Sequence, residues 1–383
     1  MKIIGIISEY NPLHLGHAKQ FDVIRRKIGD DSGIVCLMSG NFTQRGYPAI
    51  FEKTRRAEAA VRCGADLVLE LPVTTALRSA EGFAAGGVSI LSDFCDYLCF
   101  GAESNDKDML MTIAKTLLSK DFNFKLRSQL EKGISFPTAR QKALEEMGID
   151  GSLIATPNNI LAVEYCKAIF TQKSNMQPLP ILREGSYHDT LPDSENPSAT
   201  AVRNLLTQAG NWQDYVPKEA ASVYENAPMH TLSAGERAVL GKLRCMDDEA
   251  FEALPYGSEG LWRKLMHAAR KYATLEEILT ATKSKRYTRT RLDRMVMCAF
   301  LGLSQKDMDA PVPYVRVLAL NHRGGEIVKK ARCAGAFLNI GEVTNHPYQN
   351  LEDRCNRLFG LFKEGSPGPS EEKNKSRIFY LNH

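Results

Sequence analysis

Short apolar runs alternate with longer amphipathic patterns along the first half of the chain. The apolar runs are typical of strands that are covered on both faces, and they occupy residues 3–7, 33–38, 66–71, 97–100 and 179–182. The segments between them place apolar residues at helical spacing, as in 51–62 and 79–91. Strands that alternate with helices imply right-handed crossovers. The pattern therefore predicts an α/β fold with a doubly wound parallel sheet, whose ligand lies beyond the carboxyl ends of the strands.

The second half of the chain is mostly helical in pattern. A late strand is predicted at 314–320, followed by a turn at Gly324 and Gly325, and 363–376 has the composition of a flexible tail. We therefore expect an α/β domain and a mostly helical, basic carboxyl-terminal region, which divide the chain into 1–204 and 205–383.

Composition is ordinary for a protein that stays in water. Hydrophobic residues make up 43% of the 383 residues and charged residues 25%. No apolar run approaches the roughly 18 residues that a membrane-spanning helix needs. The amino-terminal sequence lacks the charged-then-apolar layout of a secretion signal. We therefore expect a cytoplasmic protein without membrane contact.

The nine cysteines are dispersed and form no Cys-x-x-Cys pair. Four of them lie in or beside apolar runs, at Cys36, Cys63, Cys95 and Cys99. Reduced thiols in the core are the expected state, rather than disulfides or a zinc site. These residues therefore predict no metal centre.

Charge is uneven along the chain. The formal net charge is +4, made up of −2 over residues 1–200 and +6 over 201–383. The stretch 283–294, KSKRYTRTRLDR, holds six basic residues, one acid and Tyr287. Clustered cations can contact nucleic-acid phosphates, and an aromatic ring among them can stack on a base. A solvated helix face is the alternative. The candidate RNA contacts are Lys285, Arg286, Arg289 and Arg291.

Two histidines follow the first predicted strand. Asn11 and Pro12 break that strand, and a helix is predicted to begin near His14. His14 and His17 are three residues apart, so on the first helical turn they share a face beside free backbone N–H groups. Gly16 between them has no side chain to keep a nucleotide away from the helix start. The arrangement predicts a phosphate site, although a surface pair of histidines or a small metal site has the same pattern.

Further loops leave the carboxyl ends of the predicted strands. Residues 39–49 form one, Gly101 opens a second, and Arg183 with His188 lies in a third. A glycine at a strand end would admit an adenine or ribose. Each feature alone is also compatible with an ordinary turn or a solvated charge, but together on one sheet edge they favour a ligand site. The pattern Ser-x-Thr-x-x-Arg at 198–203 adds a helix start that can hold phosphates.

Together these motifs resemble one family. His-x-Gly-His after a first strand is similar to the motif of the nucleotidyltransferase superfamily. The stretches EYNPLHLGH, SGNFTQRG, KTRRAEAAVRCGADLVLELP, FGAES, PNNILAVEY and KRYTRTR resemble the tRNA(Met) cytidine acetate ligase family over essentially the whole chain. In that family, ATP and acetate form acetyl-adenylate. The acetyl group then passes to the wobble cytidine of elongator tRNA(Met), which gives N4-acetylcytidine.

The resemblance implies roles for individual residues. His14 and His17 would contact the ATP phosphates and stabilise charge during adenylyl transfer. Gly101, Asn159 and Arg183 would make the later ATP contacts. The family's nucleotide loop falls on Ile7, Ser8, Glu9, Tyr10, Asn11, Pro12, Leu13, His14, Leu15, Gly16, His17, Ala18, Lys19 and Gln20.

Two details of the resemblance stay open. Asn158 is as polar as Asn159, so that contact can fall on either residue, and 198–203 reads SATAVR where the superfamily more often has a second serine. ATP, acetate and elongator tRNA(Met) are the implied substrates, with Mg²⁺ as the implied ion. No Gly-x-x-x-x-Gly-Lys-Ser/Thr motif supports a P-loop mechanism. The alternatives are an adenylyltransferase of cofactor biosynthesis and a non-catalytic RNA-binding protein. Neither the acetate pocket nor the oligomeric state is predicted.

Overall fold

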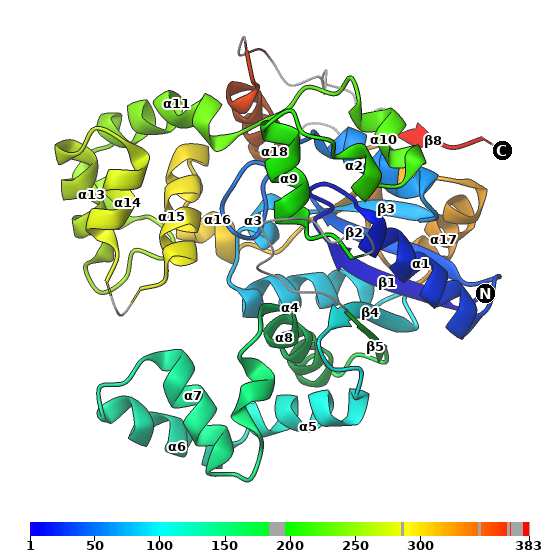
Figure 1. Cartoon of the computed structure of the whole chain (residues 1–383), viewed down its shortest axis with the longest axis horizontal. Coiled ribbons are helices and arrows are strands. Elements are labelled where there is room, and N and C mark those ends of the chain that lie inside the picture. Colours follow the sequence, from blue (N-terminus) through cyan, green and yellow to red (C-terminus); the bar gives the residue numbers. More distant parts are fainter. Residues whose placement is uncertain (184–195, 285–286, 344–345, 366–367, 369–377, 383) are drawn as a thin grey trace.

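A mostly parallel sheet with helices on both faces forms the centre of the molecule (Figure 1). The computed structural model describes residues 1–183, 196–284, 287–343, 346–365, 368 and 378–382. Five parallel strands lie side by side in the order β5 (Gln177–Leu182), β4 (Tyr97–Ala102), β1 (Ile3–Ser8), β2 (Gly33–Ser39) and β3 (Leu67–Leu71). The sequence pattern predicted each of these strands, and the parallel α/β sheet is confirmed.

Alternate side chains of the central strands pack into two separate cores. The helices that cover the sheet include α1 (Leu15–Ile28), α2 (Lys53–Arg62), α4 (Ala80–Leu91) and α8 (Pro157–Thr171). On β2, Val35 and Leu37 pack into the same core as residues of α4 and α8. Ile34 and Cys36 pack into the core that contains residues of α1 and α2. A strand covered on both faces needs this uninterrupted apolar run.

Residues from the far end of the chain extend the sheet. β6 (Val315–Leu320) pairs antiparallel with β3, and β7 (Leu338–Asn339) and β8 (Phe379–Tyr380) pair with β6. The predicted late strand is confirmed, whereas its antiparallel pairing was not foreseen. The sheet includes strands from both sides of residue 204, and the division of the chain at that point stays a prediction.

The turn predicted at Gly324 and Gly325 is wrong. Both glycines lie in α17 (His322–Cys333), and the Gly324 N–H donates to Oδ1 of the capping residue Asn321 at 2.9 Å. A Cβ at position 324 would lie 2.0 Å from the backbone oxygen of Asp66. The glycine therefore lets a helix press against the end of β3, and the Gly-Gly pair reflects close packing instead of a turn.

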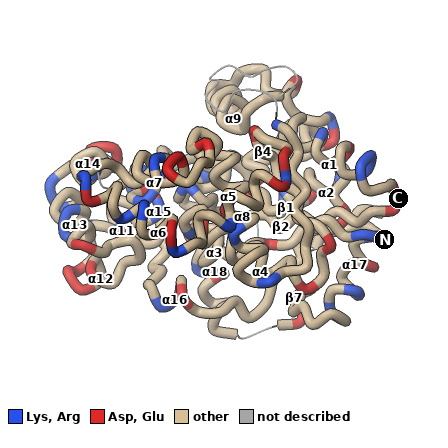
Figure 2. The backbone as a smooth tube through the Cα atoms, turned by 90° about the horizontal axis from the view of Figure 1, so that it is seen from below, with Lys and Arg blue, Asp and Glu red and all other residues tan. Residues whose placement is uncertain are grey.

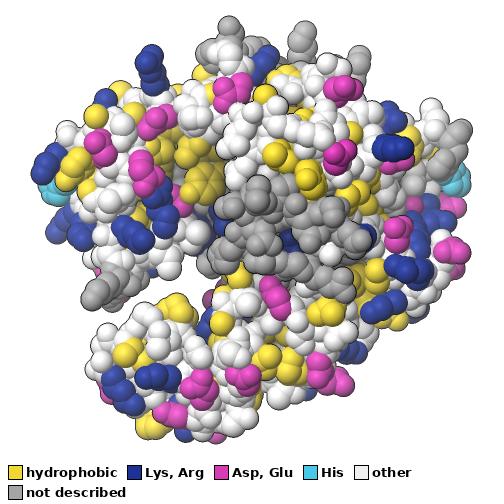
Figure 3. Space-filling model, viewed as in Figure 1, with side chains coloured by type: hydrophobic (Ala, Val, Ile, Leu, Met, Phe, Trp, Pro, Cys, Tyr) yellow, Lys and Arg dark blue, Asp and Glu magenta, His cyan; other side chains and the backbone are white. Residues whose placement is uncertain are grey.

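Two helical lobes project from the sheet (Figure 1). The first contains α5 (Lys107–Leu117), α6 (Lys120–Glu131) and α7 (Phe136–Glu145). The second contains α11 (Leu232–Cys245), α12 (Asp248–Glu252), α13 (Leu261–Lys271), α14 (Leu275–Thr282), α15 (Arg289–Leu301) and α16 (Gln305–Asp309). The surface is hollowed between α6–α7 and the second lobe (Figure 3).

The second lobe has its own apolar core, which reaches into the sheet domain. Phe42, Val73 and Leu77 belong to this core, together with residues of α18 (Pro347–Phe359). Two shorter helices, α9 (Ala199–Thr207) and α10 (Lys218–Tyr224), link the sheet to the second lobe in sequence. Among the described residues, no helix combines the length and the apolar character that crossing a membrane requires.

Candidate nucleotide site

The turn between β1 and α1 places both predicted histidines at the start of a helix. His14 is the N-cap residue of α1, and His17 lies in its first turn. The His14 N–H donates to Nδ1 of His17 at 3.3 Å, and the two rings stack with centroids 3.7 Å apart. His14 is only 2% exposed and His17 is partly buried, so the pair is not simply two solvated surface histidines. Two imidazoles over a helix N-terminus form an arrangement suited to an anion.

Both histidines are held in their neutral form. Burial, with the neighbouring imidazole of His17 and the charges of Arg183 and Arg203, places the pKa of His14 well below its usual range. Burial and Arg183 lower the pKa of His17 to about 3. Both ring nitrogens of His14 are buried without a hydrogen-bond partner. Since buried polar atoms are nearly always paired, these nitrogens indicate a polar ligand, and the two arginines favour a negatively charged one.

The ends of β4 and β5 form the far side of the site. Gly101 is exposed at the end of β4, and a Cβ there would meet only Cβ of Arg183, at 4.0 Å. The Arg183 N–H donates to the carbonyl oxygen of Ala102 at 2.8 Å, and its Nη1 donates to Oδ1 of Asn158 at 3.4 Å. The structure thus brings Gly101, Arg183 and Asn158 together at one edge of the sheet, and, chain neighbours aside, no other described residue comes within 4 Å of a Cβ built on the glycine.

Asn159 holds the strand-end loop in place. Its Oδ1 accepts hydrogen bonds from the backbone N–H groups of Glu103 and Ser104, at 2.9 and 3.2 Å. The side chain is 4% exposed. Of the two neighbouring asparagines, Asn158 is therefore the one whose side chain contacts Arg183, whereas Asn159 shapes the loop that follows Gly101.

Glu103 is a residue of this site that the sequence interpretation missed. Its carboxylate accepts hydrogen bonds from Thr156 Oγ1 at 2.9 Å, Asn158 Nδ2 at 2.7 Å and the Asn159 N–H at 2.8 Å. An acid at a helix N-terminus satisfies free N–H groups and is favoured by the helix dipole. The sequence does contain an acid shortly after the strand-end glycine, in GAES. An acid there implies a hydrogen-bonding partner, but the sequence does not show which helix supplies it.

The start of α9 closes the opposite side of the site. Ser198 caps this helix. Nη1 of Arg203 donates to the backbone oxygen of Asn11 in the nucleotide loop at 2.6 Å. Lys19, on α1, donates to Oδ1 of Asn196 at 3.2 Å. The Ser-x-Thr-x-x-Arg stretch therefore lies beside the histidine turn, as expected for two parts of one phosphate site.

The loop after β2 connects the nucleotide loop to the second lobe. The Gln44 N–H donates to Oε1 of Glu9 at 2.7 Å. Gly46 has φ +83 and lies so close to α15 that a Cβ would be 2.6 Å from the carbonyl carbon of Asp293. The Tyr47 hydroxyl donates to Oδ2 of Asp293 at 2.9 Å. Position 46 therefore requires glycine, both for its backbone conformation and for this close approach.

Two of the four candidate RNA contacts bind groups within the protein. Arg289 donates to both carboxylate oxygens of Glu276, at 2.8 and 2.6 Å, and to Oδ1 of Asp293 at 2.9 Å. Arg291 donates to the carbonyl oxygen of Tyr256 at 2.9 Å. Both guanidinium groups thus hold α15 against its neighbours, and an RNA phosphate would have to share or replace these partners.

The expected stacking role of Tyr287 is wrong. Its ring is 8% exposed in the apolar core of the second lobe, and its hydroxyl donates to Glu259 at 2.8 Å. Lys285 and Arg286 lie outside the described residues. Figure 2 shows Lys and Arg around α11, α13 and α15, with Asp and Glu on α12 beside them. The basic character of this lobe is therefore mixed with acidic groups.

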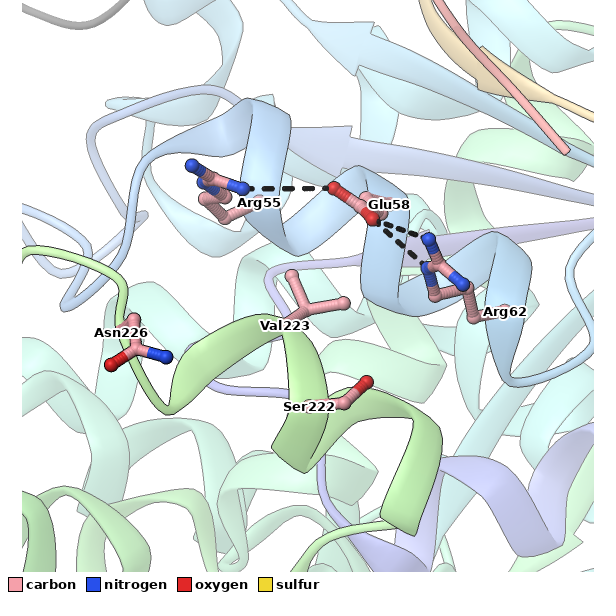
Figure 4. Close-up of a pocket in the computed structure, with 6 residues that line it drawn as sticks. All are labelled: Arg55, Glu58, Arg62, Ser222, Val223 and Asn226. Carbon is pink, nitrogen blue, oxygen red and sulfur yellow. Dashed lines mark hydrogen bonds and ion pairs between the residues drawn. The ribbon is translucent and has the colours of Figure 1, made fainter.

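A surface pocket between α2 and α10 is separate from the nucleotide site (Figure 4). Both arginines that line it approach Glu58, with Nη1 of Arg55 at 3.9 Å and Nη2 of Arg62 at 2.9 Å from its carboxylate. The remaining lining residues are Ser222, Val223 and Asn226. Because Glu58 neutralises part of the positive charge and no residue of the nucleotide loop lines this pocket, we do not assign ATP to it.

Metal-binding side chains do not gather at the histidine turn. Within the ranges that the structure describes, no group of three or more His, Cys, Asp or Glu residues has a geometry that could hold a metal ion. We therefore derive no chemical step through a metal ion held by such a cluster.

Solved structures resemble this chain along its whole length. The crystal structure of Thermotoga maritima TmcAL bound with alpha-thio ATP has 28% sequence identity and a TM-score of 0.87, and the match covers 100% of both chains. The apo form of the same protein gives a TM-score of 0.88. The fold is therefore one that holds an ATP analogue in a relative.

Sequence comparisons give the family. A family model described as HIGH Nucleotidyl Transferase matches residues 1–371. The tRNA(Met) cytidine acetate ligase of Clostridium acetobutylicum is 34% identical, with 92% of each chain covered. That of Alkaliphilus metalliredigens is 36% identical, with 99% of each chain covered. On the strength of these matches and of the histidine turn described above, the chain belongs to the tRNA(Met) cytidine acetate ligase family of HIGH nucleotidyltransferases.

Proposed function

We propose that this protein uses ATP to convert acetate into acetyl-adenylate and transfers the acetyl group to the wobble cytidine of elongator tRNA(Met). The family supports this function, and a relative of the same fold binds an ATP analogue. The observation that carries the proposal is the buried His14, whose ring nitrogens lack protein partners beside Arg183 and Arg203. The reaction takes place in the cytoplasm, where tRNA is modified and used.

The first step needs alignment and charge stabilisation more than a protein nucleophile. An acetate oxygen attacks the α-phosphorus of ATP, the bond to the bridging oxygen of the β-phosphate breaks, and pyrophosphate leaves. His14 and His17 donate N–H groups to phosphate oxygens, while Arg183 and Arg203 and the start of α1 stabilise the negative charge. Gly101 leaves room for the nucleoside, and Asn158 positions Arg183 beside it.

The second step moves the acetyl group. The exocyclic N4 of cytidine attacks the acetyl carbonyl carbon, a C–N bond forms, and the C–O bond to the phosphate breaks so that AMP leaves. The proton lost from N4 passes to solvent. The product is N4-acetylcytidine, and the protein supplies proximity between the adenylate and the base.

We propose that Mg²⁺ binds together with ATP. When bound, it would neutralise phosphate charge and orient the leaving pyrophosphate. Since no described cluster of acidic or histidine side chains forms a metal site, we expect the ion to arrive on ATP, and the roles assigned to His14 and Arg183 do not depend on it.

We assign tRNA binding to the carboxyl-terminal part of the chain. Residues 1–204 would carry the ATP chemistry, whereas 205–383, with its net charge of +6 over 201–383, would hold the anticodon arm. Within 283–294, Lys285 and Arg286 are the better candidates for phosphate contacts, because Arg289 and Arg291 already bind protein groups. Phosphate contacts fix the orientation of the RNA without reading its sequence.

Two assays test the proposed function. The first measures acetate-dependent exchange of radiolabelled pyrophosphate into ATP without tRNA, and the second measures N4-acetylcytidine in elongator tRNA(Met) by mass spectrometry. We expect both activities, and we expect exchange to need acetate at roughly millimolar concentration, because four heavy atoms supply little binding energy.

Other outcomes would assign the protein elsewhere. Exchange that requires a phosphorylated small molecule instead of acetate would indicate an adenylyltransferase of cofactor biosynthesis. RNA binding without any exchange would indicate a non-catalytic binding protein. Modification of tRNA by acetyl-CoA in the absence of ATP would contradict the proposed chemistry directly.

A further inference from the structure

A pocket of ≈ 210 Å³ lies between the nucleotide loop and the second lobe. Three segments that are distant in sequence line it: the loop after β2, α9, and the residues at the start of α11. The lining residues are Tyr47, Pro48, Ile50, Arg203, Asn204, Thr207, His230, Thr231 and Leu232. None of the roles discussed above uses this pocket as a whole.

Two of the lining residues bind a single residue of the nucleotide loop. Nη1 of Arg203 donates to the backbone oxygen of Asn11 at 2.6 Å. The Ile50 N–H donates to Oδ1 of the same asparagine at 2.7 Å, and the carbonyl of Ile50 accepts from the His230 N–H at 2.8 Å. One wall of the pocket is therefore built directly on the turn that carries His14.

A third lining residue faces the basic segment. The hydroxyl of Tyr47 donates to Asp293, which also accepts from Arg289 at 2.9 Å. The pocket thus lies between the phosphate-binding turn and the stretch to which we assigned RNA contacts. An RNA that contacts the basic segment and reacts with the adenylate would place its reacting base between that segment and the turn that carries His14.

The chemistry of the lining suits a flat, neutral, polar-edged ring. Pro48, Ile50 and Leu232 are apolar, whereas Asn204 and Thr207 carry amide and hydroxyl groups. One cation, Arg203, also lines the pocket, and its Nη1 donates to the backbone oxygen of Asn11 at 2.6 Å. None of the described residues that line the pocket carries a carboxylate. Such a lining can cover the faces of a base and bind its edge.

His230 adds a buried polar atom to this wall. It is 4% exposed, its ring stacks on Phe359 with centroids 4.1 Å apart, and its Nδ1 has no hydrogen-bond partner. Burial lowers the pKa of His230 to about 4, so the imidazole is neutral at physiological pH. A neutral imidazole whose Nδ1 has no partner is compatible with an uncharged ligand and adds no charge to the lining.

We infer that this pocket receives the pyrimidine ring of the acetyl-accepting cytidine, turned out of the anticodon loop; the inference rests on the function proposed above. Bases of a single-stranded loop can be unstacked and inserted into a protein pocket at modest energetic cost. The Arg203 contact with Asn11 then places the exocyclic amine near the adenylate. The pocket recognises a pyrimidine nucleoside within RNA.

A rim substitution tests the inference. Thr207 is exposed, and its hydroxyl bonds only to backbone oxygens of its own helix, at 3.0 Å to Arg203 and 3.1 Å to Asn204. Thr207→Trp should occupy the pocket. Gln208→Trp adds the same bulk at the next exposed position, outside the lining, and is the matched control.

The measured quantity is the rate of tRNA acetylation divided by the rate of tRNA-free pyrophosphate exchange, which cancels any loss of folded protein. We expect this ratio to fall at least tenfold in Thr207→Trp and to stay at the parent value in Gln208→Trp. An unchanged ratio in Thr207→Trp would overturn the inference. If the KM for acetate in the exchange reaction rose in Thr207→Trp while the ratio stayed unchanged, the pocket would bind acetate. That result would overturn the inference as well.

Photocrosslinking locates the base directly. An anticodon stem-loop RNA with 5-bromocytidine at the wobble position is irradiated on the full-length protein, and the modified peptide is identified by mass spectrometry. We expect the crosslink on the peptide that contains Tyr47. A crosslink confined to peptides that do not line the pocket would refute the assignment. Absence of exchange in the parent protein would instead refute the proposed function, and this inference with it.

Discussion

At the scale of single residues, different side chains of the site donate hydrogen bonds and carry the positive charge. His14 and His17 have lowered pKa values and are neutral donors, so they can bind phosphate oxygens without carrying a proton that burial would oppose. The positive charge near the histidines comes from Arg183 and Arg203. Because His14 and His17 stay neutral, the hydrogen bonds that they can donate do not change over the pH range in which ordinary histidines titrate.

The histidines are predicted to support adenylate formation. His14→Ala or His17→Ala should slow acetate-dependent pyrophosphate exchange by about 10²-fold, because each change removes a preorganised donor from developing charge. His267→Ala, an exposed residue of α13, is the control and should exchange at the parent rate. A folded His14→Ala/His17→Ala double variant that exchanges normally would end the assignment.

The lowered pKa of His17 has a consequence for stability. Between about pH 6.5 and about pH 3 the unfolded chain binds a proton that the folded chain does not, so the free energy of unfolding falls as pH falls through this window. Urea unfolding at pH 7 and pH 5 measures the change. His17→Gln should lose less stability than the parent, by on the order of 1 kcal/mol. His267→Gln should behave like the parent, and equal losses in all three proteins would contradict the burial argument.

At the scale of elements, the start of α8 is organised by one acid from the loop after β4. Glu103 binds Thr156, Asn158 and the Asn159 N–H, while Asn159 binds back to the loop of Glu103. These reciprocal bonds fix the spacing between Gly101 and α8. The nucleoside side of the site is therefore formed jointly by the loop after β4 and the start of α8.

Glu103 is predicted to be a positioning residue for ATP. Glu103→Gln keeps the shape but loses the charged acceptor, which is worth roughly 1.5–3 kcal/mol per hydrogen bond to a charged group. We expect the KM for ATP in the exchange reaction to rise about tenfold, with a smaller change in kcat. Glu131→Gln, at an exposed position of α6, serves as the control. A fall in kcat at constant KM would show that the acid acts in the chemistry instead.

A feature could be predicted from the sequence when the residues that define it lie close together along the chain. The strand at 33–38 and the histidine turn were predicted because their patterns lie within a few consecutive residues. The partner of Glu103 lies more than 50 residues away, and β6 pairs with β3 across about 250 residues. No local pattern encodes such pairings. The turn at Gly324 was mispredicted for the same reason, since the close contact with Asp66 that requires glycine is non-local.

At the scale of the whole molecule, the loop after β2 joins the nucleotide site to the basic lobe. Gln44 binds Glu9 on one side, and Tyr47 binds Asp293 on the other. Arg289 binds Asp293 as well, so its guanidinium is part of the contact between the loop after β2 and the second lobe. A substitution there would disturb lobe packing along with any RNA contact, and the RNA-binding role has to be tested elsewhere in the segment.

The salt dependence of tRNA binding provides that test. If about four cations of 283–294 meet phosphates, log affinity should fall against log salt with a slope of about −3, at roughly −0.7 to −0.9 per contact. Lys285→Ala/Arg286→Ala should flatten the slope by about 1.5. Arg289→Ala/Arg291→Ala should also lower the melting temperature, because it breaks bonds to Glu276 and Tyr256.

Lys120→Ala/Lys132→Ala removes two exposed cations from the first lobe and serves as the control for the salt experiment. Its slope should match the parent if binding is confined to the basic segment. A parent-like slope in Lys285→Ala/Arg286→Ala would show that the segment is a solvated face after all.

The antiparallel pairing of β6 with β3 also sets the order in which the protein can be made. When β3 leaves the ribosome, the strand that will pair with it is still about 250 codons from being translated. At 5–20 residues per second, that interval lasts on the order of 10–50 s. During it, one edge of a largely apolar sheet stands open, and open edges invite pairing with other chains. We therefore expect the nascent chain to be exposed to such pairing until β6 has been translated.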